Sequence, residues 1–136
     1  MEAIKRFFTQ DKFAAHSGIE LLEVAPGYAK TRMRVDSRHL NALNTVQGGA
    51  LFTLADFAFA AASNAHGTAA VALNVTISFV KAVTAGVVTA EAKEMAASAR
   101  TAHYTINITN DQGELVGIFQ GTVYRKKTPL DFSAAG

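Results

Sequence analysis

The sequence contains no cysteine, and its four histidines, His16, His39, His66 and His103, are not spaced like zinc ligands. Disulfide bonds and cysteine-based metal sites are therefore excluded, and the absence of cysteine fits a cytoplasmic location. We expect no metal site and no redox cofactor.

The chain also has little excess charge. Its formal net charge is +2, which argues against nucleic-acid binding, and its aromatic residues are not interleaved with basic ones. The one basic run, Arg125-Lys126-Lys127, is expected to be a solvated edge at the end of the last strand. No nucleic-acid partner is predicted.

Long apolar runs are missing as well. The segment from Ala50 to Ala62 is too short to span a bilayer, and it carries Asp56. The first eight residues lack the apolar run and cleavage site of a secretory signal. We expect no association with a membrane.

The length and composition fit one domain. The chain has 136 residues, of which 49% are apolar, enough for a substantial core. We expect a single domain over residues 1–127 and a flexible C-terminal tail over residues 128–136.

Apolar periodicity predicts an α+β fold. Residues 1–15 are typical of one or two short amphipathic helices, and Gly48 to Asn64 of a single long helix that is apolar nearly all round. Strands that alternate between apolar and polar residues are expected at 19–24, 28–35, 71–79, 87–95, 102–109 and 115–124. The order is a hairpin, the buried helix and an antiparallel meander, which favours a curved sheet wrapped around one central helix.

Asp56 is the only carboxylate between Leu40 and Val80, and His66 is the only other ionisable residue there. A charge buried in this apolar helix costs several kcal/mol unless something compensates. Asp56 is therefore either a structural acid, bonded to backbone or hydroxyl groups, or a reactive one. His39 and His66 are expected to be loop or helix-end residues.

The start of the helix has the second feature of interest. Phe52, Phe59 and Gly49 share the helix side of Asp56, and Gly48-Gly49 place free N–H groups and the positive dipole end at the helix start. The two glycines let a ligand or another backbone approach closely. A carboxylate and an oxyanion donor are the parts needed to hydrolyse an acyl group.

The run Asn41 to Gly49, followed by Leu54-Ala55-Asp56, resembles the signature of hotdog-fold acyl-CoA thioesterases. It is similar to the phenylacetate-pathway (PaaI-type) branch of the 4-hydroxybenzoyl-CoA thioesterase superfamily. The resemblance runs from about Gly18 to Arg125. Two positions depart from the family pattern: Gln47 replaces the usual His, and Ala70 stands where some relatives have Ser or Thr.

The resemblance implies that the chain hydrolyses an acyl-CoA thioester, as a homodimer or homotetramer with sites at the dimer interface. The Gly48 N–H would polarise the thioester carbonyl, and Asn41 would help to place it. Asp56, supplied by the other subunit, would act as general base or nucleophile. The role of Gln47 at the usual His position is open.

Four further residues are predicted to bind the substrate: Gly49, Phe52, Lys81 and Arg100. The last two are candidates for the coenzyme A phosphates, although solvated surface charge is the alternative. Asn41 has the alternative of a loop anchor, and Gly48-Gly49 that of close packing. The rival functions are a non-catalytic acyl-CoA-binding hotdog domain and a hotdog hydratase or dehydratase, which would need a catalytic His.

Overall fold

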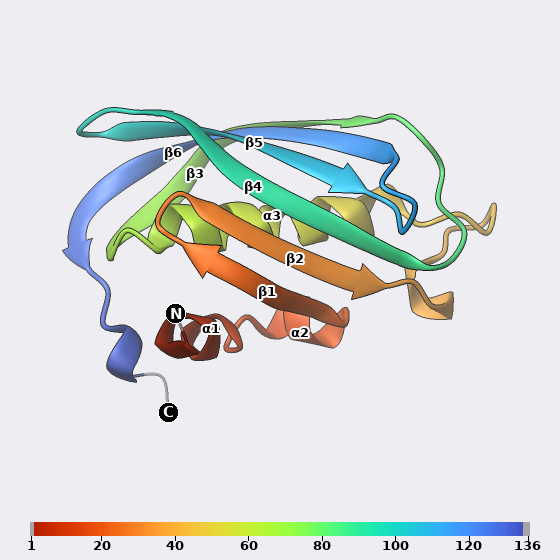
Figure 1. The fold of residues 1–136 in the computed structure, drawn as a ribbon, viewed down its shortest axis with the longest axis horizontal. Coiled ribbons are helices and arrows are strands. Elements are labelled where there is room, and N and C mark those ends of the chain that lie inside the picture. The colour runs from red at the N-terminus through yellow and green to blue at the C-terminus, as the bar shows by residue number, and fades with distance from the viewer. Residues whose placement is uncertain (1, 135–136) are drawn as a thin grey trace.

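A computed structural model describes residues 2–134, and it shows one antiparallel sheet curved around a central helix (Figure 1). The sheet order is β1-β2-β4-β5-β6-β3. The strands are β1 (Ile19–Ala25), β2 (Tyr28–Arg34), β3 (Thr68–Phe79), β4 (Val87–Ala97), β5 (Thr101–Thr109) and β6 (Leu115–Pro129). The helices are α1 (Glu2–Phe8), α2 (Lys12–His16) and α3 (Gly48–Asn64), with 3₁₀ turns η1 (Ser37–His39) and η2 (Phe132–Ala134).

The expected meander is wrong in one respect. The strands β4, β5 and β6 do form a meander, but β3 pairs with β6 at the far edge and β4 pairs with β2. The chain crosses from β3 to β4 through residues 80–86. Local alternation carries no information on which edge a strand joins, because all candidate partners offer the same backbone ladder.

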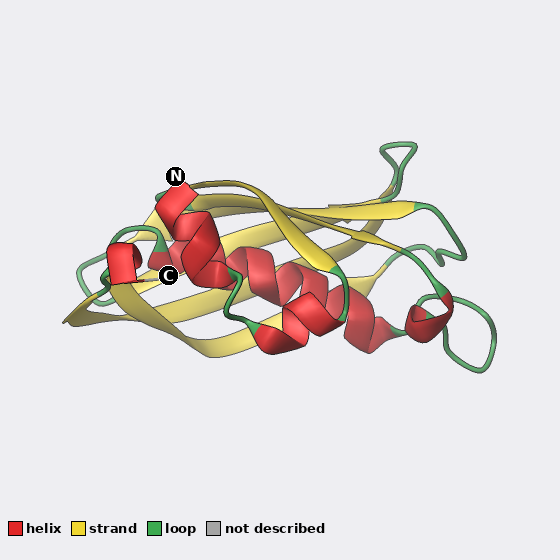
Figure 2. Cartoon of the chain, turned by 90° about the horizontal axis from the view of Figure 1, so that it is seen from below, coloured by secondary structure: helices red, strands yellow, loops and turns green. Residues whose placement is uncertain are grey.

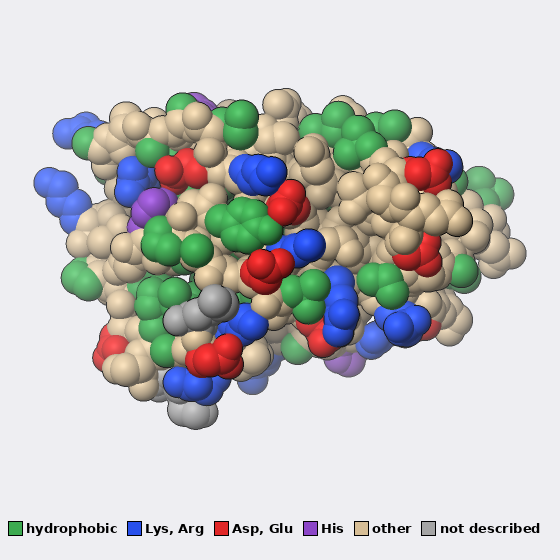
Figure 3. Space-filling view, in the orientation of Figure 1, with side chains coloured by type: hydrophobic (Ala, Val, Ile, Leu, Met, Phe, Trp, Pro, Cys, Tyr) green, Lys and Arg blue, Asp and Glu red, His purple; other side chains and the backbone are tan. Residues whose placement is uncertain are grey.

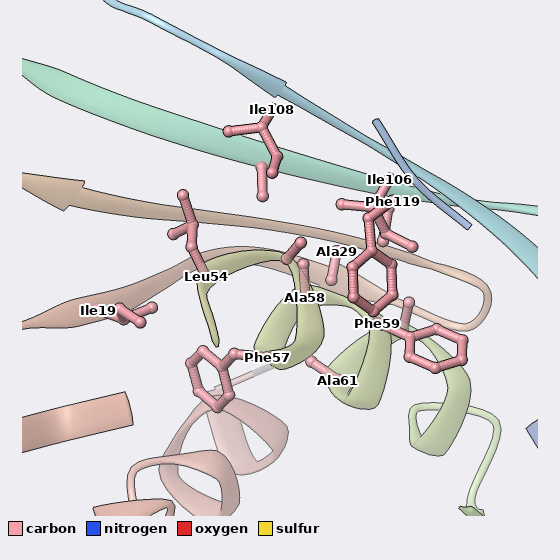
Figure 4. Close-up of a cluster of buried hydrophobic side chains, with 14 of the residues drawn as sticks. Ile19, Ala29, Leu54, Phe57, Ala58, Phe59, Ala61, Ile106, Ile108 and Phe119 are labelled. Carbon is pink, nitrogen blue, oxygen red and sulfur yellow. The ribbon is translucent and has the colours of Figure 1, made fainter. Parts of the chain in front are cut away.

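Helix α3 fills the concave side of the sheet, as Figure 2 shows from below. Alternate side chains of β2, including Ala29, Thr31 and Met33, are fully buried against it, and Thr31 Oγ1 donates to the Leu54 carbonyl at 3.0 Å. The core contains mainly Ala and Val side chains, and Figure 4 shows Phe, Ile and Ala residues packed together in one part of it. Gly121 makes room for the Phe59 ring, since a Cβ there would lie 2.6 Å from it.

The C-terminal segment is more structured than the expectation of a tail from residue 128. Strand β6 continues to Pro129, and η2 follows it. The Phe132 ring contacts the Phe7 ring of α1 edge to face, at a centroid distance of 5.3 Å. Residues 1, 135 and 136 lie outside the described residues. Within the described part, no helix is both long and apolar enough to cross a membrane.

Candidate active site

The N-terminus of α3 presents an unoccupied hydrogen-bond donor. Gln47 caps the helix: its side-chain Oε1 accepts from the Gly49 N–H at 2.9 Å, and its carbonyl accepts from the Ala50 N–H at 2.9 Å. The Gly48 N–H donates to no acceptor within residues 2–134. It therefore lies free at the positive end of the helix dipole, where a developing oxyanion is stabilised.

The ring of Phe79 lies close to Gly48. A Cβ at this position would lie 2.9 Å from the Cζ atom of Phe79, which ends β3 and is 55% exposed. Gly48, Phe79 and Lys81 line one cavity of about 400 Å³. Lys81, predicted to bind the substrate, lies close to the helix start, where its ammonium donates to Glu114 at 2.6 Å.

Gln47, Gly49 and Phe52 line a second cavity, of about 420 Å³, on the adjacent side of the helix start. The Phe52 ring is half-buried and packs against Phe119 at a centroid distance of 5.3 Å. The structure thus brings four of the predicted residues together around Gly48: Gln47, Gly49, Phe52 and Lys81.

Asn41 organises the loop that leads to this helix. Its Oδ1 accepts from the N–H groups of Leu43 and Thr45, at 2.9 and 3.2 Å, and its Nδ2 donates to Thr45 Oγ1 at 3.0 Å. These bonds occupy both polar atoms of the amide. In this structure the side chain acts as a loop anchor, which matches the alternative weighed for it.

His39 is a residue whose importance the sequence did not reveal. It is 4% exposed; Nδ1 accepts from the Asp36 N–H at 3.0 Å, and Nε2 lies 2.7 Å from the Ser17 carbonyl. Its own carbonyl accepts from the Gln47 N–H at 2.8 Å. His39 therefore ties the cap of α3 to the N-terminal segment. The Asp36-x-x-His39 spacing of a capping box was the available signal.

Asp56 lies in the middle of α3, on a stripe that the sheet leaves partly accessible. The stripe contains Gly49, Thr53, Asp56, Ala60 and Asn64. Within the described chain the Asp56 carboxylate has no hydrogen-bond partner, unlike the structural acid considered above. Burial raises the pKa of Asp56, and the negative charge of Asp11 raises it further. A desolvated carboxylate with a raised pKa is suited to general-base catalysis.

Asp56 and Gly48 of one chain lie far apart along α3. They are eight residues apart on the helix, which corresponds to about 12 Å along its axis. A carbonyl bonded to the Gly48 N–H and a base acting at the same carbon must be much closer than that. Arg100 lies still further away, since it lines a cavity with Thr68, beyond the C-terminal end of α3.

No candidate metal centre emerges from the same residues. In the range 2–134, no group of three or more His, Asp or Glu side chains is placed to hold a metal ion. The helix start itself offers backbone N–H donors and the capping amide of Gln47.

The family model of the thioesterase superfamily matches residues 43–117, and the chain belongs to this family. It is 38% identical to the acyl-coenzyme A thioesterase PaaI of Escherichia coli, over 87% of this chain and 85% of the relative. The solved E. coli PaaI protein, from the phenylacetic acid degradation operon, has a TM-score of 0.90 with 34% identity, covering 96% of this chain and 95% of that one.

A solved mutant of the phenylacetic acid degradation protein PaaI from Thermus thermophilus has a TM-score of 0.82 and 41% identity, over 85% of this chain and 100% of that one. These similarities confirm the predicted hotdog fold and the PaaI-type resemblance. The chain is a thioester hydrolase of this type.

Proposed function

We propose that two copies of this chain form each active site, with Gly48 from one subunit and Asp56 from the other. The activity is acyl-CoA thioester hydrolysis, in keeping with the PaaI relatives. One observation carries the site assignment: a free Gly48 N–H and an unpartnered, half-buried Asp56 are held about 12 Å apart in one chain. In the proposed dimer, Asp56 of the partner subunit lies nearer to Gly48 than Asp56 of the same chain does.

The edge strand β3 supports this pairing. It is twelve residues long and pairs on one side only, with β6. Apolar side chains along it and just after it are exposed, with Leu73 57% and Val80 54% accessible. An exposed apolar edge of this length invites pairing with another strand. We infer that β3 pairs with β3 of the partner subunit, and that the pair extends the sheet across a two-fold axis.

This symmetry sets the two α3 helices antiparallel. Gly48 of one helix then lies level with Asp56 of the partner subunit when the axis passes level with Phe52, the residue midway between them. The accessible stripe on α3 is the surface that the partner covers. Pairing of two such dimers gives the proposed homotetramer, and the cysteine-free composition favours a cytoplasmic location.

In the reaction the thioester carbonyl accepts a hydrogen bond from Gly48 N–H. Asp56 of the partner subunit removes a proton from water, and the hydroxyl adds to the carbonyl carbon. The oxyanion is stabilised by the helix N-terminus. Collapse breaks the carbon–sulfur bond, and the coenzyme A thiolate leaves and takes up a proton. If Asp56 instead attacks directly, the same geometry gives an acyl-aspartyl anhydride that water then cleaves.

The remaining predicted residues have supporting roles in this proposal. Gln47 holds Gly49 and leaves Gly48 free, Asn41 fixes the loop before the cap, and Phe52 and Gly49 line the cleft. No cofactor is required.

A hydrolysis screen across aryl, short-chain and long-chain acyl-CoA thioesters tests the function, with release of coenzyme A followed by a thiol reagent. We expect turnover that Asp56→Asn lowers by about two orders of magnitude or more. Single turnover in ¹⁸O-water separates the two routes, because only direct attack places the label in Asp56. Wild-type-like turnover by Asp56→Asn would refute the proposed mechanism.

A further inference from the structure

Two exposed phenylalanine rings flank the start of α3. The chain has nine phenylalanines, all within the described residues, and only Phe13 and Phe79 are exposed. Phe79 lines the cavity that contains Gly48, and Phe13 lines the cavity on the adjacent side, together with Gly49 and Phe52. We call the second one the Phe13 cavity. Exposed aromatic rings gathered around one reactive group are typical of a binding surface.

The outer face of the sheet has a different character. Over β1, β2 and β4 it carries Lys and Arg side chains beside Asp and Glu, as Figure 3 shows. Three ion pairs on these strands join Lys30 to Glu23, Arg32 to Glu20 and Lys93 to Glu91. A surface of paired charges stays hydrated and gives an apolar group nothing to pack against. The apolar part of a substrate is better accommodated on the helix side.

The position of Phe13 is fixed relative to the helix start by a series of hydrogen bonds. The Phe13 carbonyl accepts from the Ser17 N–H at 3.1 Å, one turn further along α2. The Ser17 carbonyl lies 2.7 Å from Nε2 of His39, whose own carbonyl accepts from the Gln47 N–H at 2.8 Å. Gln47 is the N-cap of α3. The backbone that carries Phe13 is therefore in place beside Gly48 before a substrate arrives.

Three polar side chains of the Phe13 cavity are already bonded within the chain. The Arg38 guanidinium donates to the Asp36 carboxylate at 3.2 Å, and the Thr53 hydroxyl donates to the Gly49 carbonyl at 2.8 Å. Both ring nitrogens of His39 have partners. A ligand in this cavity meets chiefly aromatic and methyl surface, which suits a hydrocarbon group better than the amide-bearing pantetheine arm of coenzyme A.

We propose that Phe13 is a specificity-determining residue, whose ring forms a wall of the acyl pocket and selects aryl-bearing acyl groups over acetyl. The inference rests on the proposed function. A thioester carbonyl bonded to the Gly48 N–H has two substituents, the acyl group and the sulfur. The acyl group enters the Phe13 cavity, where it contacts Phe13 and Phe52. The sulfur and its polar arm lead out of that cavity.

Helix α2 lies outside the part of the chain that the family model matches. The model covers residues 43–117, whereas α2 spans Lys12–His16. Gly48 and Asp56 thus belong to the shared core, and the ring that selects the acyl group comes from a segment in front of it. Acyl specificity can then change through α2 without any change in the catalytic groups.

The test compares phenylacetyl-CoA with acetyl-CoA. Phe13→Ala removes the ring, and Phe13→Tyr keeps it. The matched control is Met95→Ala, which shortens another exposed apolar side chain, on β4. Because Phe13 is 70% exposed, its truncation removes little internal packing.

We expect the wild type to have the higher kcat/KM with phenylacetyl-CoA. The ratio of the two kcat/KM values should fall by about fivefold to tenfold in Phe13→Ala, the scale of one aromatic contact. It should stay within about twofold of the wild-type ratio in Phe13→Tyr and Met95→Ala. A wild-type preference for acetyl-CoA, or an unchanged ratio in Phe13→Ala, would overturn the assignment. An equal loss with both thioesters would also overturn it, because the ring would then serve the fold or a subunit contact.

Stable analogues keep this inference separate from the proposed function. The S-phenacyl and S-acetonyl thioethers of coenzyme A carry a ketone and cannot be hydrolysed. In calorimetric titrations the wild type should bind the phenacyl thioether more tightly, and Phe13→Ala should lose most of that preference. This result without any thioester hydrolysis would refute the thioesterase mechanism and still support the acyl pocket. Hydrolysis with the same preference in wild type and Phe13→Ala would refute the pocket alone.

Discussion

Subunit mixing provides the sharpest test of the shared site. Two variants are needed, each defective in a different half. Asp56→Asn removes the base. Gly48→Pro removes the free N–H, and proline is well tolerated at the first position of a helix. Gln47, the residue before it, already has φ −64° and ψ 138°, the backbone conformation that a following proline favours. The exposed ring of Phe79 must shift slightly to accept the added atoms.

Each variant alone should be nearly inactive. Loss of an oxyanion donor lowers kcat by about 10²–10³, and loss of a general base lowers it by about 10²–10⁴. A mixed dimer differs, because its two sites are not equivalent. One site combines both substituted residues, whereas the other combines an unchanged Gly48 with an unchanged Asp56.

Random exchange of subunits at equal concentrations makes about half of the dimers mixed, and each has one intact site of two, so the mixture should recover about a quarter of wild-type activity. The variants are refolded together and assayed for thiol release, with separately refolded samples combined just before the assay as the control. Recovery below about one per cent, although native mass spectrometry shows mixed dimers, would refute a site built from two subunits.

Three further results are expected. Burial raises the pKa of Asp56 above its ordinary value of 3.8. The folded protein therefore holds this proton more tightly than the unfolded protein, and it loses stability as pH rises from the unfolded-state pKa through the folded-state pKa. Asp56→Asn should raise Tm at pH 7, with a gain that shrinks towards pH 4, as calorimetry would show. Gln47→Ala should lower kcat less than Asp56→Ala, because the amide caps Gly49 and the reacting donor is the backbone of Gly48; equal losses with intact circular dichroism would make Gln47 a primary catalytic group. Leu73→Lys on the β3 edge should give a monomer in light scattering, whereas Leu43→Lys, at an exposed loop position, should not.

The sequence predicts the elements of this fold closely, because periodicity is a local property. Helix α3 begins at Gly48 and ends at Asn64, as the apolar pattern indicated, and the hairpin turns at Pro26-Gly27. Gly27 has φ 77°, a backbone conformation that favours glycine. What alternation left undetermined is the position of β3 at the far edge beside β6, which depends on contacts between residues distant in the chain.

The same distinction applies to the candidate site. Gly48, Gly49 and Asp56 stand out because a glycine pair and a lone acid are unusual in an apolar helix. His39 does not stand out, since its role depends on a segment that folding brings close: the Ser17 carbonyl lies 2.7 Å from its Nε2. Sequence spacing cannot show that a polar side chain is buried.

Three features of the single chain are incomplete in the same place. Strand β3 has one unpaired edge, α3 has a stripe that the sheet leaves accessible, and Asp56 has no hydrogen-bond partner within the described residues. One contact with a second copy would complete all three, and it would also bring Gly48 to the base. Assembly and activity are then linked by mass action, because only the associated form contains a site. Specific activity should consequently fall on dilution below the Kd of the dimer, at the concentration where light scattering detects dissociation.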